Sequence, residues 1–359
     1  MSLESSLILV TGGAGFIGSN FINHLFESGM PVRVVNVDKL TYAGNPKNLR
    51  AVESNQNYRF IYEDIVNAEG VESAFVFAEE YFGRKVDAVV HFAAESHVDR
   101  SIDSPVEFLQ TNVVGTQVML ETARRHDVHR FVHISTDEVY GSLGIEGSFT
   151  EESSLSPNNP YAASKAAADM LAHAYHQTYN FPVIITRSSN NYGPSQFPEK
   201  LIPLMIANAL NDQPLPVYGD GMNVRDWLHV RDHCRAIVRV LEDGKPGEIY
   251  NISGRTEKTN LDIVKTILRQ LEKSDSLIQF VADRPGHDRR YSMDTAKIEE
   301  NLRWQPEISF ENGIRQTIDW YLNNSEWVKT VKTDEYNDYY NRMYRERGSW
   351  IESLKNKQD

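Results

Sequence analysis

The chain has 359 residues, of which 40% are hydrophobic and 24% are charged, so it is long enough to bury a substantial core. Its formal net charge of −13 argues against a general nucleic-acid-binding protein, although a few local arginines could still bind a phosphorylated small molecule. The single cysteine, Cys234, excludes an internal disulfide, and no apolar run reaches the roughly 20 residues that a membrane span requires. The amino-terminal residues do not resemble a signal peptide, so we expect a protein of the reducing cytoplasm.

The first 190 residues alternate short apolar runs with amphipathic ones. The apolar runs are β-branched and aromatic, and we predict them to be buried strands. They lie at residues 7–12, 32–38, 58–64, 87–94, 130–137 and 182–187. Strands that are apolar along their whole length and alternate with helices predict an α/β fold, a doubly wound parallel Rossmann sheet covered by helices on both faces.

The pattern changes after Arg187, where segments rich in Pro, Gly and Asn replace the regular alternation. We therefore predict a cofactor-binding domain over residues 1–188, with about 226–253 returning to it. A smaller, discontinuous substrate-binding lobe is predicted over 189–325. Residues 326–359 form a charged, tyrosine-rich tail that the sequence leaves open as a packed helix or a mobile end.

A dinucleotide-binding turn is predicted where the first strand meets the first helix. Gly12, Gly15 and Gly18 have the spacing that lets backbone amides approach a pyrophosphate, and Asp38 ends the next strand about 20 residues later. A carboxylate there would bond the ribose 2′-hydroxyl and so favour NAD over NADP. With the other strand ends, the predicted cofactor residues are Gly12, Gly15, Phe16, Ile17, Gly18, Asp38, Lys39, Leu40, Thr41, Asp64, Ile65, Phe92, Ala93, Ala94 and Ser96.

Two further strings predict the chemistry. Tyr161 and Lys165 are four residues apart on a predicted helix, so both side chains leave the same helical face. We expect the lysine to lower the pKa of the tyrosine, which could then accept a proton, and to bond the nicotinamide ribose.

Thr136, Asp137 and Glu138 occupy the turn that follows the strand at 130–137. Two carboxyl groups in one enclosed site tend to have pKa values that are pushed apart, which supplies one acid and one base. Hydride transfer alone needs no such pair. The string therefore indicates an oxidation that serves a second reaction, the loss of water.

The chain resembles the extended short-chain dehydrogenase/reductases, and among them the dTDP-glucose 4,6-dehydratase family. The resemblance spans about residues 7–322 and is carried by TGGAGFIGSN, VDKLTYAGN, AAESHVDRSI, STDEVYG, YAASK, SNNYGP, FPEKLIP, RDWLHV and DRPGHDRRY. It implies that Thr111 and Asn191 also contact the cofactor. It further implies a nucleotide-sugar site formed by Ser96, Thr136, Asn190, Lys200, Leu201, Pro216, Tyr218, Arg225, Asn260, Arg284 and His287.

The resemblance also implies a mechanism. Tyr161 takes the proton from the 4-hydroxyl as hydride passes to NAD, and Thr136 bonds the same oxygen. The resulting ketone acidifies carbon 5, Glu138 removes that hydrogen, and Asp137 protonates the departing 6-hydroxyl. Hydride then returns to carbon 6 and carbon 5 is reprotonated, so NAD behaves as a retained group. The resemblance implies a homodimer paired through helices at 104–126 and 160–180, and a role in deoxysugar synthesis, such as rhamnose for surface polysaccharides.

Two alternatives stay open. One is another nucleotide-sugar dehydratase, a decarboxylase or a 4-epimerase on the same frame. The other is a protein that senses NAD and has lost the chemistry. The joint presence of Tyr161, Lys165, Asp137 and Glu138 argues against this second alternative. His126, His129 and His133 lack the usual spacing of metal ligands, so we expect no metal site.

Overall fold

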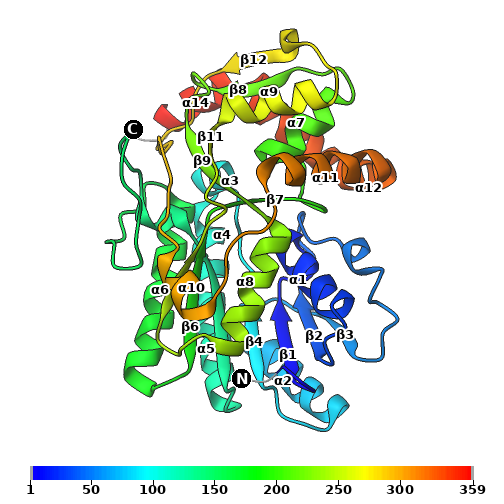
Figure 1. Ribbon diagram of the computed structural model, residues 1–359, viewed down its shortest axis with the longest axis vertical. Helices are drawn as coiled ribbons and strands as arrows, with labels where there is room; N and C mark the ends of the chain where they lie inside the picture. The colour runs from blue at the N-terminus through cyan, green and yellow to red at the C-terminus, as the bar shows by residue number, and fades with distance from the viewer. Residues whose placement is uncertain (1–2, 357–359) are drawn as a thin grey trace.

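The computed structural model describes residues 3–356 and contains a seven-stranded parallel sheet with a smaller lobe above it (Figure 1). The strand order is β10-β6-β5-β4-β1-β2-β3. The strands are β1 (Leu7–Thr11), β2 (Arg33–Asp38), β3 (Tyr58–Tyr62), β4 (Ala88–His91), β5 (Arg130–Thr136), β6 (Val183–Ser188) and β10 (Ile249–Ile252). The order reverses at β1, so the doubly wound parallel fold predicted from the sequence is confirmed.

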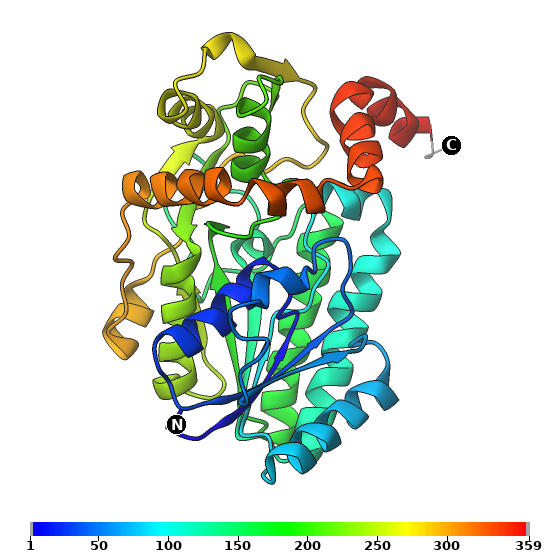
Figure 2. The same cartoon turned by 90° about the vertical axis from the view of Figure 1, so that its right-hand side faces the viewer.

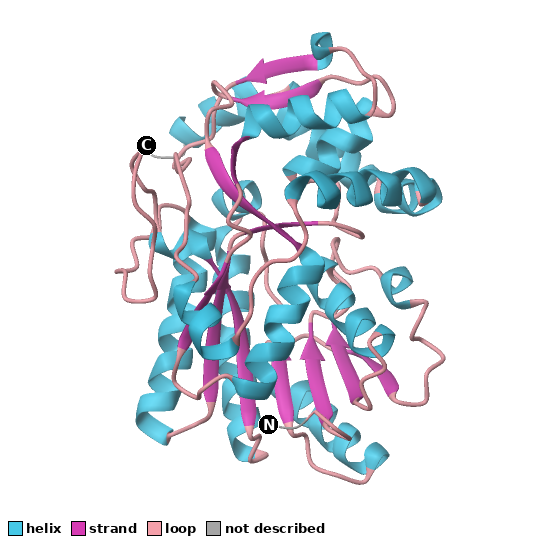
Figure 3. Cartoon of the chain, viewed as in Figure 1, coloured by secondary structure: helices cyan, strands magenta, loops and turns pink. Residues whose placement is uncertain are grey.

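Helices cover both faces of this sheet, as Figure 3 shows. Alternate residues of β1 point to opposite faces: Ile8 and Val10 join one fully buried cluster, whereas Leu7 and Leu9 join another. This explains why the strands are apolar along their whole length. The flanking helices are α1 (Phe16–Glu27), α2 (Ala68–Phe82), α5 (Thr116–Arg125), α6 (Pro160–Tyr179), α8 (Val230–Asp243) and α10 (Ala296–Leu302).

A short helical run precedes α5. It consists of α3 (Val98–Asp103), α4 (Pro105–Phe108) and a π-helical stretch, η2 (Leu109–Gly115). Within η2, Asn112 accepts from the amide of Glu95 at 2.9 Å and donates to the carbonyl of Glu95 at 3.0 Å. The run therefore holds the loop that leaves β4.

The lobe is built on short strands and three longer helices. A three-stranded sheet has the order β11-β9-β7, and β12 pairs with β8. These elements are β7 (Asn190–Tyr192), β8 (Leu215–Tyr218), β9 (Val224–His229), β11 (Glu257–Thr259), β12 (Ile278–Val281), α7 (Leu201–Ala209), α9 (Asn260–Gln270) and α11 (Phe310–Asn323). Because β7 follows β6 after one residue, the lobe starts at the carboxyl edge of the large sheet.

The tail consists of helices that pack on the rest of the molecule. They are α12 (Ser325–Val331), α13 (Asp334–Tyr340), a π-helical stretch η5 (Asn341–Arg345) and α14 (Arg347–Asn356). Figure 2 shows α11 and α12 crossing between the sheet and the lobe, with the last helices beyond them. Across the described residues 3–356, no helix is both long and apolar enough to span a membrane.

Candidate active site

The turn after β1 requires glycine at two positions. Gly12 has φ +69°, and a Cβ there would lie 2.6 Å from the amide nitrogen of Ala93. A Cβ on Gly18 would collide with the carbonyl oxygen of Gly12, so only glycine lets α1 pack this closely on the turn. The amino end of α1 therefore faces a cavity through bare backbone, which is the arrangement that binds a pyrophosphate.

Asp38 lies beside this turn at the end of β2. Its carboxylate accepts from the amide of Ala14 at 2.9 Å and from the amide of Leu40 at 2.8 Å. Burial raises the pKa of Asp38, and these two hydrogen bonds oppose the rise. The side chain is thus fixed at the wall of a cavity.

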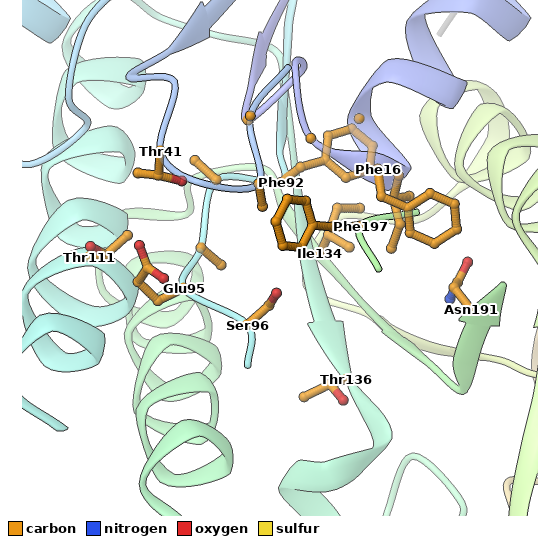
Figure 4. Close-up of a pocket in the computed structure, with 18 of the residues that line it drawn as sticks. Phe16, Thr41, Phe92, Glu95, Ser96, Thr111, Ile134, Thr136, Asn191 and Phe197 are labelled. Atoms are coloured by element: carbon orange, nitrogen blue, oxygen red, sulfur yellow. The ribbon is translucent and has the colours of Figure 1, made fainter. Parts of the chain in front are cut away.

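A cavity runs from this turn to the end of β5. The predicted residues that line it are Gly12, Gly15, Phe16, Ile17, Gly18, Asp38, Lys39, Thr41, Ile65, Phe92, Ala93, Ala94, Ser96, Thr111, Thr136, Asp137, Glu138, Tyr161, Lys165, Asn190, Asn191 and Lys200. Figure 4 shows how Ser96, Thr111, Thr136 and Asn191 come from separate elements to this one space. The glycine turn, the ribose carboxylate and the apolar walls together fit an extended dinucleotide such as NAD.

Two predicted cofactor residues do not line the cavity. Leu40 contributes its backbone amide to Asp38. Asp64 follows β3 by two residues, and its carboxylate accepts from the amide of Val66 at 3.0 Å and pairs with Lys39 at 3.3 Å. Both residues support the wall from outside.

Tyr161, Lys165 and Thr136 meet at the inner end of the cavity, and each is buried. Asn159 caps α6 by accepting from the amide of Ala162 at 2.8 Å, which sets the first turn that carries Tyr161. Lys165 Nζ donates to the carbonyl oxygen of Ile134 at 2.8 Å. The structure thus brings the tyrosine, the lysine and the threonine together.

The expected lowering of the pKa of Tyr161 is wrong for this structure. Burial raises the pKa of Tyr161 well above its ordinary value, and the nearby carboxylate of Glu138 raises it further. The charge of Lys165 is directed at the Ile134 carbonyl, and burial lowers the pKa of Lys165 to about 8. Spacing along a helix predicts the shared face correctly, but it does not report how deeply the pair is buried.

Asp137 and Glu138 lie in the turn after β5, where Thr136 Oγ1 accepts from the amide of Glu138 at 3.2 Å. Asp137 is 2% exposed, and its Oδ2 has no hydrogen-bond partner among the described residues. Burial and the neighbouring Glu138 raise the pKa of Asp137 well above its ordinary value. A carboxyl group in this condition favours the protonated form and can act as an acid.

A second cavity, in the lobe, contains most of the predicted substrate residues. It is lined by Asn190, Lys200, Leu201, Pro216, Tyr218, Arg225, Asn260, Arg284 and His287. Ser96 and Thr136 line the cofactor cavity instead. Glu138, Asn190, Asn191, Gln196, Glu199 and Lys200 line both cavities, so the two spaces share a wall.

Several residues that line these cavities are not predicted by the sequence. Glu199 is 4% exposed and pairs with Arg100 at 3.0 Å. It belongs to the string FPEKLIP, but the resemblance implies a role only for Lys200 and Leu201, which follow it. Glu95 stands inside the string AAESHVDRSI, of which only Ala93, Ala94 and Ser96 are predicted, and Gln196 lies in a loop outside the strings. Tyr344 reaches the lobe cavity from the tail, where no motif marks it.

A buried charge network lies behind Lys165. Asp169, one turn further along α6, pairs with Arg187 Nε of β6 at 2.9 Å and lies 3.3 Å from His133 Nε2 of β5. All three side chains are almost fully buried. Arg187 also donates to the hydroxyl of Tyr140 at 2.9 Å, which ties the network to the turn that carries Glu138.

The histidines noted in the sequence have separate surroundings. His126 lies 2.9 Å from Glu72 and 3.2 Å from Glu79, whereas His133 belongs to the network with Asp169. Within residues 3–356, no group of three or more His, Cys, Asp or Glu side chains is arranged to hold a metal ion.

Comparison with known proteins agrees with this geometry. The family profile described as GDP-mannose 4,6 dehydratase matches residues 9–317. A dTDP-glucose 4,6-dehydratase from Xanthomonas campestris pv. campestris is 51% identical over 346 residues, which cover 91% of this chain and 96% of that protein. The chain belongs to the dTDP-glucose 4,6-dehydratase family.

Solved structures distinguish this family from its neighbours on the same fold. A dTDP-glucose 4,6-dehydratase from Streptomyces venezuelae, solved with NAD and TYD bound, is 51% identical, with a TM-score of 0.86 over 91% of this chain and 100% of that one. A UDP-glucose 4-epimerase from Thermus thermophilus, in complex with NAD, has a TM-score of 0.80 over 89% of this chain and 99% of the epimerase, at 30% identity. The fold is therefore shared with epimerases, whereas sequence identity is higher with the dehydratase.

Proposed function

We propose that this chain converts dTDP-glucose to dTDP-4-keto-6-deoxyglucose in an NAD-dependent hydro-lyase reaction. The observation that carries the proposal is the position of Asp137 and Glu138. They leave β5 beside Tyr161, and Glu138 lines both the cofactor cavity and the lobe cavity. An acid and a base at this junction can act on a sugar held across it.

When bound, NAD would supply a hydride acceptor, its reduced form a hydride donor, and its oxidised ring a positive charge. Tyr161 accepts the proton of the sugar 4-hydroxyl, and Thr136 orients that hydroxyl. Lys165 would bond the nicotinamide ribose. Because Tyr161 is buried and faces Glu138, positive charge near the tyrosine is needed to bring its pKa towards neutrality.

The elimination is assigned to the two carboxyl groups. Glu138 removes the hydrogen on carbon 5, which the ketone at carbon 4 acidifies, and returns a proton from solvent exchange to carbon 5 when the hydride adds to carbon 6. Asp137, whose pKa is raised by burial and by Glu138, protonates the 6-hydroxyl as it departs as water. Acid and base steps of this kind each contribute about 10²–10⁴-fold to a rate.

In the lobe, Arg225 and Arg284 would bind the diphosphate, since a guanidinium presents a planar fork to phosphate oxygens. Arg225 is buried and Arg284 is half-buried. Burial of His287, together with the charges of both arginines, lowers the pKa of His287 to about 3. Asn190 and Lys200 are on the shared wall, where the sugar would lie. Residues 1–188 with 226–253 would then bind the cofactor, and 189–325 the nucleotide sugar.

We also propose a homodimer formed through the helical runs 104–126 and 160–180. Val106, Leu109 and Val114 on the first run are 64%, 51% and 40% exposed, and Met170 on the second is 66% exposed. Large apolar side chains that remain exposed on adjacent helices favour burial against a partner. A cytoplasmic role in deoxysugar synthesis, such as rhamnose for surface polysaccharides, belongs to the same proposal.

The test is incubation with dTDP-, UDP-, CDP- and GDP-sugars in deuterated water without added coenzyme. We expect dTDP-glucose to lose one water and to gain deuterium at carbon 5. A 4-epimerase would give a product of unchanged mass without label at carbon 5, and an NAD-sensing protein would give no product. Asp137→Asn and Glu138→Gln should slow water loss about 10²–10⁴-fold while NAD stays bound. Unchanged dehydration by both variants would refute the assigned roles.

A further inference from the structure

The tail contacts the cofactor site through a direct chain of hydrogen bonds. Trp327 of α12 donates its indole N–H to Asn48 Oδ1 at 2.7 Å. The same amide of Asn48 donates to the carbonyl oxygen of Ala14, in the glycine turn, at 3.0 Å. Ala14 in turn donates its N–H to Asp38. Thus α12 is connected through Asn48 to the glycine turn and, through Ala14, to Asp38.

A second contact is apolar and covers a residue of the cavity wall. Phe197 lines the cofactor cavity, and its ring packs against Tyr42 at 5.4 Å and against Tyr336 of α13 at 5.9 Å. Val331 completes this small buried cluster. The hydroxyl of Tyr336 donates to the carbonyl of Pro198 at 2.9 Å. The tail therefore holds Phe197 against the loop that follows Asp38.

The third contact is a stacked cation. The guanidinium of Arg100 lies 3.7 Å from the ring centre of Tyr42 and 4.2 Å from that of Tyr339. It pairs with Glu199, whose side chain is 2% exposed and which lines both cavities. Arg100 thus connects the loop after Asp38, the tail and the shared wall.

We propose that residues 325–340 act as a clasp that retains the dinucleotide between turnovers. The three contacts come from separate residues of the tail, and they reach the glycine turn, the loop that follows Asp38 and the segment 197–199, which line or support the cofactor cavity. Figure 2 shows α12 crossing at this level of the molecule. The inference rests on the proposed function, because a reaction that returns its hydride to the same sugar regenerates the oxidised dinucleotide, which can therefore stay bound for the next turnover.

Trp327 and Arg100 are positioning residues in this account, since they act through Asn48 and Tyr42. The test loads the full chain with labelled NAD and follows release into excess unlabelled NAD. Trp327→Phe keeps an aromatic ring and removes the N–H, and Arg100→Lys keeps the charge and removes the planar stack. We expect each variant to release NAD about tenfold faster, because a tenfold change corresponds to the loss of roughly one hydrogen bond or stacking contact. Lys329→Ala, on the exposed side of α12, should release NAD at the rate of the unaltered chain.

Release requires no turnover, so this readout is independent of the substrate. At saturating NAD, both variants should regain the product rate of the unaltered chain, with an unchanged KM for the nucleotide sugar. Unaltered NAD release from both folded variants would overturn the clasp. A raised KM for the nucleotide sugar without faster NAD release would also overturn the clasp. The tail would then act on the lobe cavity, which Tyr344 lines. If one variant fails to fold, the other decides, since their contacts are separate.

Discussion

Lys165 and Asp169 lie one turn apart on α6, and both are almost fully buried beneath Tyr161. Burial lowers the pKa of Lys165 to about 8, and the charge of Asp169 opposes that fall. His133, Arg187, Ser135 and the Ile134 carbonyl are among the charged or polar groups that surround the pair. The ring of His91 lies 5.7 Å from that of His133, and burial lowers the pKa of both histidines.

This relationship predicts a pH dependence. Lys165 is charged below its pKa, so the rate of product formation should fall as the pH rises through about 8. Asp169→Asn removes a charge that raises the pKa of Lys165, and the alkaline limb should therefore move to lower pH by about one unit or more. The measurement is single-turnover product formation against pH. Asp243→Asn, at an exposed ion pair on α8, is the control and should not move the limb.

Asp169→Asn also leaves Arg187 buried without its partner, which typically costs about 3–5 kcal/mol of unfolding free energy. Urea titration should be run beside the kinetics so that only the folded fraction is compared. A loss of stability with an unmoved alkaline limb would assign Asp169 to the scaffold alone.

Gly18→Ala should disrupt the cofactor turn. The new Cβ would collide with the carbonyl oxygen of Gly12, and the backbone must shift to admit it. We expect about 1–3 kcal/mol of destabilisation and a weakened affinity for NAD, measured by urea titration and equilibrium binding. Gly144→Ala is the matched control, since a Cβ there meets nothing within 4 Å. Equal effects of the two substitutions would contradict the steric account.

The buried histidines predict a loss of stability in acid. Burial lowers the pKa of His229 from 6.5 to about 4. Between those values the unfolded chain binds a proton that the folded chain does not, so the unfolding free energy should fall as the pH falls from 6.5 towards 4. Each such proton changes the unfolding free energy by about 1.4 kcal/mol per pH unit.

His229→Asn tests this dependence. His229 caps α8 by accepting from the amide of Arg231 at 3.3 Å, and asparagine can provide the same cap without titrating. The slope of unfolding free energy against pH should therefore decrease in this window by about 1.4 kcal/mol per pH unit, the contribution of one proton. A slope that equals that of the unaltered chain would show that His229 does not contribute.

Arg225→Lys should weaken substrate binding. The guanidinium of Arg225 donates to the carbonyls of Val224 at 2.7 Å and Asp288 at 2.8 Å and lies 4.2 Å from the centre of the Tyr291 ring. A lysine cannot keep this fixed fork, so the KM for the nucleotide sugar should rise about tenfold to a hundredfold. Arg289→Lys changes an exposed pair with Asp220 and should leave KM unaltered. Similar KM values for the two variants would exclude Arg225 from the diphosphate site.

Much of the fold could be predicted because its signals are local. Apolar strands, the glycine spacing and the Tyr161–Lys165 interval each depend on residues close in the sequence, and the structure has them where expected. The sequence places Asp64 at a strand end, but β3 ends two residues earlier, at Tyr62.

What the sequence does not predict depends on contacts between distant segments. The pKa of Tyr161 is set by burial beneath several elements, and Glu199 acquires its importance only when Arg100 stacks between Tyr42 and Tyr339. The tail has no motif at all. Its tyrosines and Trp327 become interpretable only when their partners, up to 279 residues away, are known.

The wall that the two cavities share has a physiological consequence. In the proposed reaction a nucleotide sugar would enter and leave through the lobe while the dinucleotide stays in place, so each catalytic cycle would exchange a single ligand. Electrons borrowed from the sugar would return to it without reaching the solution. The proposed reaction would therefore proceed at a rate insulated from the ratio of oxidised to reduced nicotinamide in the cell.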